Sequence, residues 1–134
     1  MLTMFEELGF ISKFNMDINS LKFFLHLVCL NYNFAPFHNM THCFNVTHVL
    51  YWIINPSTGD GYLSNIAFDP IDKLALILAA IGHDLNHPGL SNSYLSKSKH
   101  MISKTVNGQS ILENFHCFTL FNLFDQTKLL NCLD

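Results

Sequence analysis

The sequence contains no arginine and little charge of either sign. Its seven basic residues are all lysine, they face ten acidic residues, and charged residues make up only 13% of the 134 positions. Globular proteins usually carry about twice that fraction. Nucleic-acid-binding surfaces need clusters of basic residues, and arginine is preferred for bidentate binding of phosphate. The composition therefore argues against a nucleic-acid partner. It indicates that, if the protein binds phosphate, metal ions would bind it.

The sequence also lacks the patterns of a zinc ribbon, a signal peptide and a membrane-spanning helix. The four cysteines form no CxxC pair, which excludes a zinc-ribbon pattern, and their apolar neighbours predict buried free thiols in a reducing interior. These cysteines are Cys29, Cys43, Cys117 and Cys132. Glu6 and Glu7 stand where a signal peptide would be basic, and no apolar run approaches the ~20 residues of a membrane span. We therefore expect an intracellular, cytosolic protein with no membrane span in this segment, and leave open membrane association through other regions.

Apolar residues make up 49% of the chain and recur at helical spacing almost throughout, so disorder is excluded and an all-α fold is predicted. The length fits one domain or part of one. Predicted helices cover about 17–30, 38–54, 69–84 and 110–124, with a loop over 56–68, a short helical turn at 91–95 and a final helix after 125. Asp17, Asp69 and Asp125 are the predicted N-caps.

His38 and His42 are four residues apart in the sequence HNMTH. At that spacing two side chains share one face of a helix, as two ligands of one metal site would. Polar residues at the start of a helix produce the same pattern. Both interpretations stay open for this motif taken alone.

A second group of polar residues follows the apolar run 74–82 in the sequence HDLNHPG, which contains His83, Asp84 and His87. A charged Asp84 after such a run should not be buried without a partner, and a divalent ion would supply one. Nitrogen and oxygen donors together suit zinc, and carboxylate oxygen also suits magnesium or manganese. The alternative is a helix end at the surface with a solvated Asp84. Pro88 biases His87 away from helical geometry, so His83 and His87 need not share a face.

A third pattern begins at Ser110, where Ser110 and Glu113 form a predicted capping box. His116 follows among apolar residues, where a hydrogen-bonded core histidine is the default interpretation. The other histidines have no charged neighbours in the sequence. We expect His26 and His48 on helices and His100 in a surface loop.

Together, HNxxH at 38–42, HDxxHPG at 83–89 and LENxH at 112–116 resemble the catalytic domain of class I cyclic nucleotide phosphodiesterases. Asn92 completes the pattern HDxxHPGxxN, which is highly specific. The opening residues 4–10 and the helix leading to Tyr32 are also similar to that family, so the resemblance covers nearly the whole chain. It implies a multi-helical bundle of the HD and phosphodiesterase type. It also implies metal-dependent hydrolysis of 3′,5′-cyclic nucleotides, cAMP or cGMP, to 5′-nucleotides in signal transduction.

The resemblance implies a role for each matching residue. His38 matches the general acid that protonates the leaving 3′ oxygen. His42, His83 and Asp84 match ligands of a tightly held zinc ion. Asp84 also matches the carboxylate that bridges to a second ion, which is magnesium or manganese.

Three more residues match positions that hold the water molecules of the second metal ion. They are His87, Glu113 and His116. The chemistry is consistent with these residue types, because two close divalent ions lower the pKa of a bridging water and clamp the phosphate, while an imidazole protonates the departing alkoxide. No arginine is then needed to bind the phosphate.

The sequence also departs from the family pattern. The family's fourth zinc ligand is an Asp on a later helix, and the Gln that holds the purine is later still; the chain ends at Asp134 before both. We therefore expect residues 1–134 to be the N-terminal portion of a single catalytic domain that is inactive without its C-terminal half. Phe115 replaces the first His of the usual LENHH. Phe37 and Cys43 resemble variants in some high-affinity cGMP-type members, which favours cGMP only slightly.

Two functions other than that of a phosphodiesterase are also open. One is another HD-type metallohydrolase that acts on a different phosphoester, which would share the His-Asp pair but would not require HNxxH or PGxxN. The other is a non-catalytic helical module, consistent with the low charged fraction, whose helices would leave an apolar patch exposed. The nucleotide preference, regulatory domains and oligomeric state are not encoded in these motifs.

Overall fold

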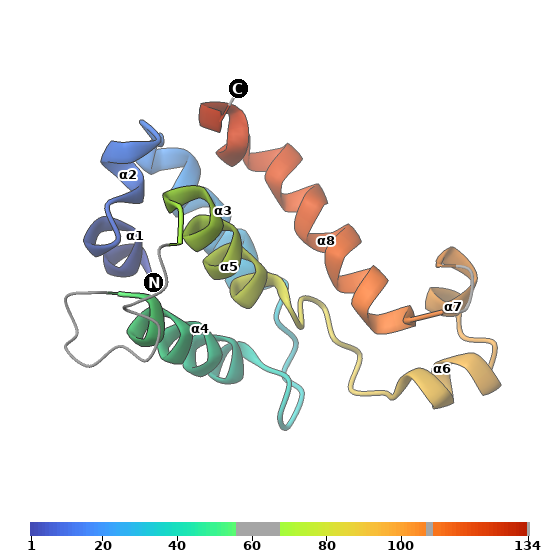
Figure 1. Ribbon diagram of the computed structural model, residues 1–134. Coiled ribbons are helices and arrows are strands. Elements are labelled where there is room, and N and C mark those ends of the chain that lie inside the picture. The colour runs from blue at the N-terminus through green and yellow to red at the C-terminus, as the bar shows by residue number, and fades with distance from the viewer. Residues whose placement is uncertain (56–67, 107–108, 134) are drawn as a thin grey trace.

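The computed structural model describes residues 1–55, 68–106 and 109–133, and within these ranges the chain is helical with no strand, as predicted (Figure 1). The helices in chain order are α1 (Leu2–Glu7), α2 (Phe10–Lys13), α3 (Ile18–Leu30), α4 (Met40–Ile54), α5 (Pro70–Gly82), α6 (Asn92–Lys97), α7 (Met101–Thr105), α8 (Ile111–Thr127) and the 3₁₀ segment η2 (Leu129–Leu133). The predicted loop over 56–68 lies almost wholly outside the described residues, so it stays a prediction.

The main core lies where α5 meets its neighbours. Helix α4 packs against α5, α3 packs along α8, and α5 also contacts α2 and α8. Phe24 of α3 stacks on Phe124 of α8 with ring centroids 5.3 Å apart. Full burial of one such side chain contributes about 1.5–3 kcal/mol, so this contact stabilises the packing of α3 on α8. A smaller cluster of Leu95, Ile111 and Leu112 joins α6 to α8.

Side-chain caps define where two helices begin. The Asp17 carboxylate accepts hydrogen bonds from the backbone N–H groups of Asn19 and Ser20, at 3.2 and 2.9 Å, which confirms the predicted cap of α3. The Asn39 side chain caps α4 in the same way. Helix α4 therefore begins at Met40, and the prediction that the helix already includes His38 is wrong. His38 lies in the connection before the helix.

Two other predicted caps are also wrong. Asp125 lies inside α8, and its carboxylate pairs with Lys128 at 2.7 Å. Ser110 has a left-handed backbone with φ of 44° and makes no side-chain cap bond, so there is no capping box. Asn92 caps the start of α8 instead. Its side-chain oxygen accepts from the N–H of Leu112 at 2.8 Å, and its amide donates to Glu113. Asp69 precedes α5 as predicted, but its side chain makes no cap hydrogen bond.

The cysteines are free thiols, but they are not all buried. Cys43 is buried and Cys132 is partly buried, whereas Cys29 and Cys117 are exposed, contrary to the prediction. The reason is that Cys29 and Cys117 each line a hollow that opens between helices. Apolar neighbours in the sequence therefore did not place them in the core.

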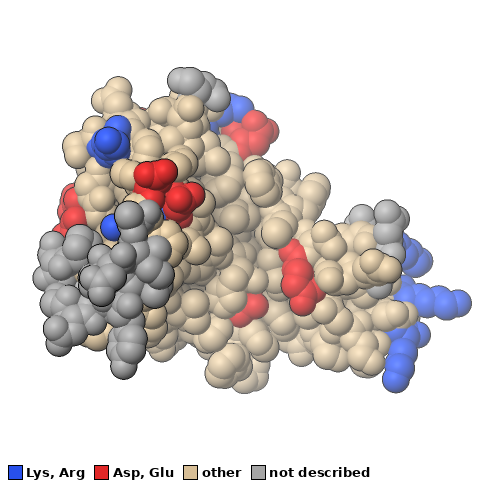
Figure 2. Space-filling view, viewed as in Figure 1, with Lys and Arg blue, Asp and Glu red and all other residues tan. Residues whose placement is uncertain are grey.

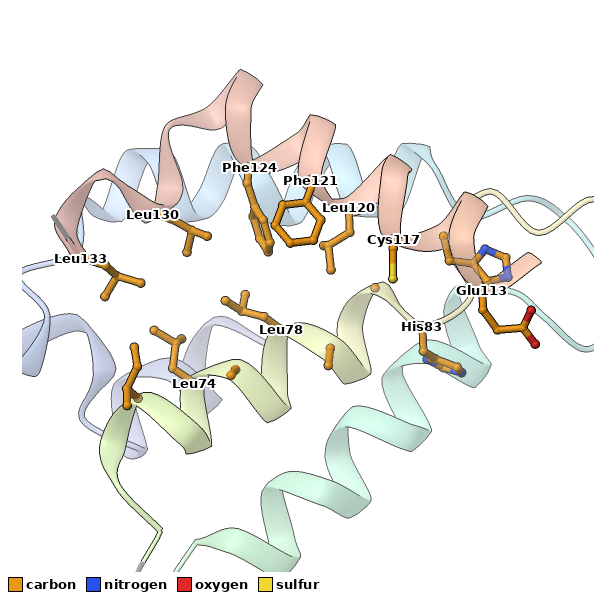
Figure 3. A pocket seen from close by; sticks show the side chains of 15 residues that line it. Leu74, Leu78, His83, Glu113, Cys117, Leu120, Phe121, Phe124, Leu130 and Leu133 are labelled. Carbon is orange, nitrogen blue, oxygen red and sulfur yellow. The ribbon is translucent and has the colours of Figure 1, made fainter. Parts of the chain in front are cut away.

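An apolar groove runs between α5 and α8 (Figure 3). Leu74 and Leu78 of α5 face Leu120, Phe121 and Phe124 of α8 across a cavity of about 520 Å³. At one end the lining changes from apolar to polar side chains. The groove therefore holds part of the exposed apolar surface expected from the composition, and other exposed apolar side chains, such as Phe34 and Phe37, lie outside it.

Charged side chains are sparse on the surface. Figure 2 shows a face on which most atoms belong to uncharged residues, with lysines projecting from the end where Figure 1 places α6 and α7. The segment 90–109 contains three lysines and no acidic residue. In the described ranges, no helix is both long enough and apolar enough to span a membrane.

Gly82 allows α5 and α8 to approach each other closely. A Cβ atom at this position would lie 2.5 Å from Leu120 Cδ2 and 3.0 Å from Leu120 Cδ1. We predict that Gly82→Ala lowers the free energy of unfolding by about 1–3 kcal/mol through overpacking. Because Leu120→Ala removes the clashing atoms, the double variant should lose less stability in urea denaturation than the sum of the two single variants.

Gly89 provides a matched control for the comparison of Gly82→Ala with Leu120→Ala. Its φ is +73°, yet a Cβ atom there would meet no atom within 4 Å. Gly89→Ala should therefore cost stability through backbone strain alone and should be additive with Leu120→Ala. Additive losses for Gly82→Ala and Leu120→Ala would contradict the close contact.

Candidate metal centre

Three side chains from two helix ends converge at the polar end of the groove. His42 Nε2 lies 3.4 Å from Asp84 Oδ2, His83 Nε2 lies 3.1 Å from the same oxygen, and the two Nε2 atoms are 3.2 Å apart. Donor atoms about 2.0–2.2 Å from a tetrahedral ion are about 3.3–3.6 Å from one another, which is close to this arrangement. His42, His83 and Asp84 therefore form a group that could hold a metal ion.

The tautomer of His83 leaves the required lone pair free. Its Nδ1 lies 2.8 Å from the backbone oxygen of Ala80, and a carbonyl oxygen can only accept a hydrogen bond. Nδ1 therefore carries the proton, and Nε2 presents its lone pair to His42 and Asp84. This is the usual arrangement of a metal-binding histidine, whose second nitrogen donates to a backbone carbonyl or a carboxylate.

Asp84 is surrounded by histidines. Its side chain is only 13% exposed, and in the described part of the chain the ring nitrogens of His42, His83 and His116 lie within 4 Å of its carboxylate oxygens. His116 Nδ1 donates to the backbone oxygen of Leu85 at 2.7 Å, so its Nε2 presents a lone pair to Asp84 Oδ1 at 3.9 Å. Burial lowers the pKa of His116, which favours the neutral ring. The site therefore gathers lone pairs around one carboxylate, and a shared cation would satisfy them.

His38, Asp84 and His87 form a second, overlapping group of possible donors. The rings of His38 and His87 are stacked, with centroids 3.9 Å apart and an interplanar angle of 13°. Lone pairs in the planes of two nearly parallel rings do not point at one ion. In addition, His87 Nδ1 accepts from the backbone N–H of Gly89 at 3.0 Å, so the neutral ring carries its proton on Nε2.

His87 is therefore suited to donate a hydrogen bond rather than to bind a metal through Nε2. Burial, followed by the nearby His38, lowers the pKa of His87 and favours this neutral form. The group of His42, His83 and Asp84 fits an ion better than the group that includes His87. The expectation that His87 need not share a helix face with His83 is confirmed, because α5 ends at Gly82.

Glu113 lies in the first turn of α8 and lines the same cavity as His83 and His116 (Figure 3). Asn92 donates to both of its carboxylate oxygens, at 3.0 and 3.3 Å, and this hydrogen bond lowers the pKa of Glu113. An ionised carboxylate therefore borders the site.

The structure thus brings six of the seven candidate residues into direct contact or stacking around Asp84, with Glu113 at the edge of the cavity beside them. The sequence analysis assigned His26, His48 and His100 no part in this group, and the structure places His26 on α3, His48 on α4 and His100 at the start of α7. His100 lies outside the helices, as expected, and is partly buried. Its Nδ1 accepts from the N–H of Ile102 and caps α7.

Asn92, Tyr32 and Asn33 contribute to the site, yet no role was assigned to them from the sequence. Asn92 occupies the last position of HDxxHPGxxN, so that motif was an available signal for it. Tyr32 and Asn33 bond to residues 81–87, about fifty positions later, and no local pattern marks such contacts.

Residues 37–134 match the sequence model of the family described as 3'5'-cyclic nucleotide phosphodiesterase. The "High affinity cGMP-specific 3',5'-cyclic phosphodiesterase 9A" of Drosophila melanogaster is 38% identical over 128 residues, which are 96% of this chain and 8% of that protein. The "cGMP-specific 3',5'-cGMP phosphodiesterase 3" of Dictyostelium discoideum is 38% identical over 112 residues, which are 84% of this chain and 23% of that protein.

The fold matches solved structures as well. The phosphodiesterase domain of the RhoPDE fusion protein from the choanoflagellate Salpingoeca rosetta superposes with a TM-score of 0.86 and 31% identity, over 98% of this chain and 40% of that one. The chain therefore spans less than a quarter of the two curated relatives and less than half of the solved domain. Its motifs, its helices and the family match lead to one conclusion: the chain belongs to the 3'5'-cyclic nucleotide phosphodiesterase family.

Proposed function

We propose that this chain contributes the metal-binding part of an active site that hydrolyses 3′,5′-cyclic nucleotides to 5′-nucleotides. The observation that carries the proposal is the convergence of His42, His83 and Asp84, with donor atoms 3.1–3.4 Å apart. Two of these residues belong to the HD pair and the third to HNxxH, and both motifs lie inside the region that matches the family.

The proposed first ion is zinc, held by His42, His83 and Asp84, because a set of two imidazole nitrogens and one carboxylate oxygen suits zinc. Asp84 Oδ2 faces His42 and His83, whereas Oδ1 is directed toward His116 and is available for a second ion, magnesium or manganese. When bound, such a pair of ions lowers the pKa of a water molecule and polarises the phosphate.

The chain's own residues would handle protons and water molecules beside the ions. We assign His38 as the general acid for the leaving 3′ oxygen, held by its stacking on His87 at 3.9 Å. His87 offers an N–H donor, while His116 and Glu113 offer acceptors, so together they could orient water molecules at the second ion.

We further propose that residues 1–134 form the N-terminal portion of one catalytic domain and that the remaining ligands come from a C-terminal portion. Supporting this, the chain matches 40% of the solved phosphodiesterase domain, so more than half of that domain lies outside the match. The relatives named above make cGMP the first substrate to test, followed by cAMP. A cytosolic location stays a prediction.

Metal binding tests the ligand assignment directly. Wild-type chain titrated with zinc or cobalt should bind one ion, weakly because three protein ligands are present. His42→Ala should reduce the affinity by more than the 10–100-fold typical for loss of an outer partner of a metal ligand. His48→Ala is the matched control, since His48 lies on the same helix and stacks on Phe44 instead. Equal binding by all three proteins would contradict the assignment.

Turnover tests the general acid. The 134 residues fused to the C-terminal part of the solved Salpingoeca rosetta domain should hydrolyse cGMP or cAMP with zinc and magnesium, whereas the chain alone should show negligible turnover. In the fusion, His38→Ala should lower kcat by about 10²–10⁴ with unchanged metal content. Robust turnover by the chain alone would contradict the proposal that the remaining ligands come from a C-terminal portion.

Two other outcomes would favour the alternative functions. Turnover of some other phosphoester would favour the broader HD-type hydrolase, and no metal binding would favour a non-catalytic module.

A substitution of Glu113 distinguishes a purely structural role of this residue from a role at the metal centre. In Glu113→Gln the side-chain oxygen still accepts from Asn92, so the start of α8 and the unfolding midpoint should be preserved. Loss of the negative charge should nevertheless lower turnover of the fusion protein by about 10-fold or more. If both stability and turnover stay at the level of the wild type, Glu113 serves only as the partner of Asn92.

A further inference from the structure

Helix α5 ends at Gly82 although the backbone of the next residue does not require an end there. His83 has φ of −61° and ψ of −26°, which are helical values. In a continued helix the N–H of Leu85 would donate to the oxygen of Ile81, but it donates to the oxygen of Gly82 at 3.3 Å instead. Two backbone groups, the oxygen of Ile81 and the N–H of Asp84, thus need other partners.

One hydroxyl group, from Tyr32, bonds to both of them, and the Cys43 thiol also donates to the oxygen of Ile81 at 3.4 Å. The buried Tyr32 follows α3, and its OH donates to the oxygen of Ile81 at 2.9 Å and accepts from the N–H of Asp84 at 3.4 Å. Burial raises the pKa of Tyr32 far above its ordinary value, so the hydroxyl keeps its proton and remains a donor. Tyr32 therefore links the last turn of α5 to the residue that bears the central carboxylate.

The neighbours of Tyr32 hold the next part of the same segment. The backbone oxygen of Asn31 accepts from the N–H of Asn86 at 2.7 Å. The Asn33 amide donates to the backbone oxygen of His87 at 2.9 Å and to the side-chain oxygen of Asn86 at 3.3 Å. Asn86 has φ of 60°, a left-handed conformation that these bonds help to maintain. Residues 31–33 thus hold residues 84–87 at three points.

We propose that Tyr32 and Asn33 are positioning residues of the metal centre, which fix the backbone of residues 84–87 so that Asp84 points at His42. The inference rests on the proposed function, because it requires that the site bind a metal ion. Each residue added to a helix rotates the next side chain by about 100°. The backbone conformation of residues 84–87, which Tyr32 and Asn33 hold, therefore sets the direction in which the Asp84 carboxylate reaches His42, 3.4 Å away.

The two hydroxyl groups of Tyr32 and Tyr51 provide a matched test. Both tyrosines are buried, and the Tyr51 hydroxyl also has two partners, Asn55 and Glu7, but these lie away from the metal centre. Tyr32→Phe should lower the affinity for zinc and cobalt by about 10–100-fold and change the visible absorption spectrum of bound cobalt. Tyr51→Phe should lose comparable thermal stability while affinity and spectrum stay at wild-type values.

The outcomes separate this inference from the proposed function. If wild-type protein binds cobalt and Tyr32→Phe gives the same affinity and spectrum, the positioning role is overturned while the metal site stands. If wild-type protein binds neither zinc nor cobalt, the proposed function fails and the inference fails with it. If Tyr32→Phe does not fold, Asn33→Ala decides, because Asn33 is exposed and its loss leaves the core intact. An unchanged cobalt spectrum in Asn33→Ala would then overturn the inference.

Discussion

The carboxylate of Asp84, nearly buried among histidines that present lone pairs, is the interaction on which the rest of this structure depends. Without a cation, the Nε2 lone pair of His83 would lie 3.1 Å from a negative oxygen, with His42 Nε2 3.4 Å from the same oxygen. Desolvated groups of this kind are costly unless something positive is shared among them. The hydrogen bond from His83 to Ala80 makes the arrangement specific, because it fixes which nitrogen faces the carboxylate.

Helix packing brings these groups together. The contact of α4 with α5 sets the start of one helix beside the end of the other, and this places His42 opposite Asp84. Gly82 lets α8 approach the same helix end, so His116 reaches Asp84 from a third element. The apolar groove between α5 and α8 has the site at one end, so apolar side chains border one flank of the polar centre (Figure 3).

Much of the fold was predictable from the sequence because amphipathic spacing and caps such as Asp17 are local signals. The His-Asp pair and HNxxH likewise identified the residues that converge. The start of α8 was not predictable, because Asn92 caps it from about twenty residues away and Ser110 instead adopts a left-handed backbone. Exposure of Cys29 and Cys117 depends on open hollows between helices, which no sequence pattern records.

X-ray absorption spectroscopy of the zinc-loaded protein tests the central claim most directly, because it reports the atoms bound to the ion without requiring turnover. The account predicts a first shell of nitrogen and oxygen at about 2.0–2.2 Å with scattering from two imidazole rings. That imidazole scattering should fall by half in His42→Ala. A shell with sulfur at about 2.3 Å, which would point to an exposed thiol such as Cys117, or a shell unchanged in His42→Ala, would contradict it.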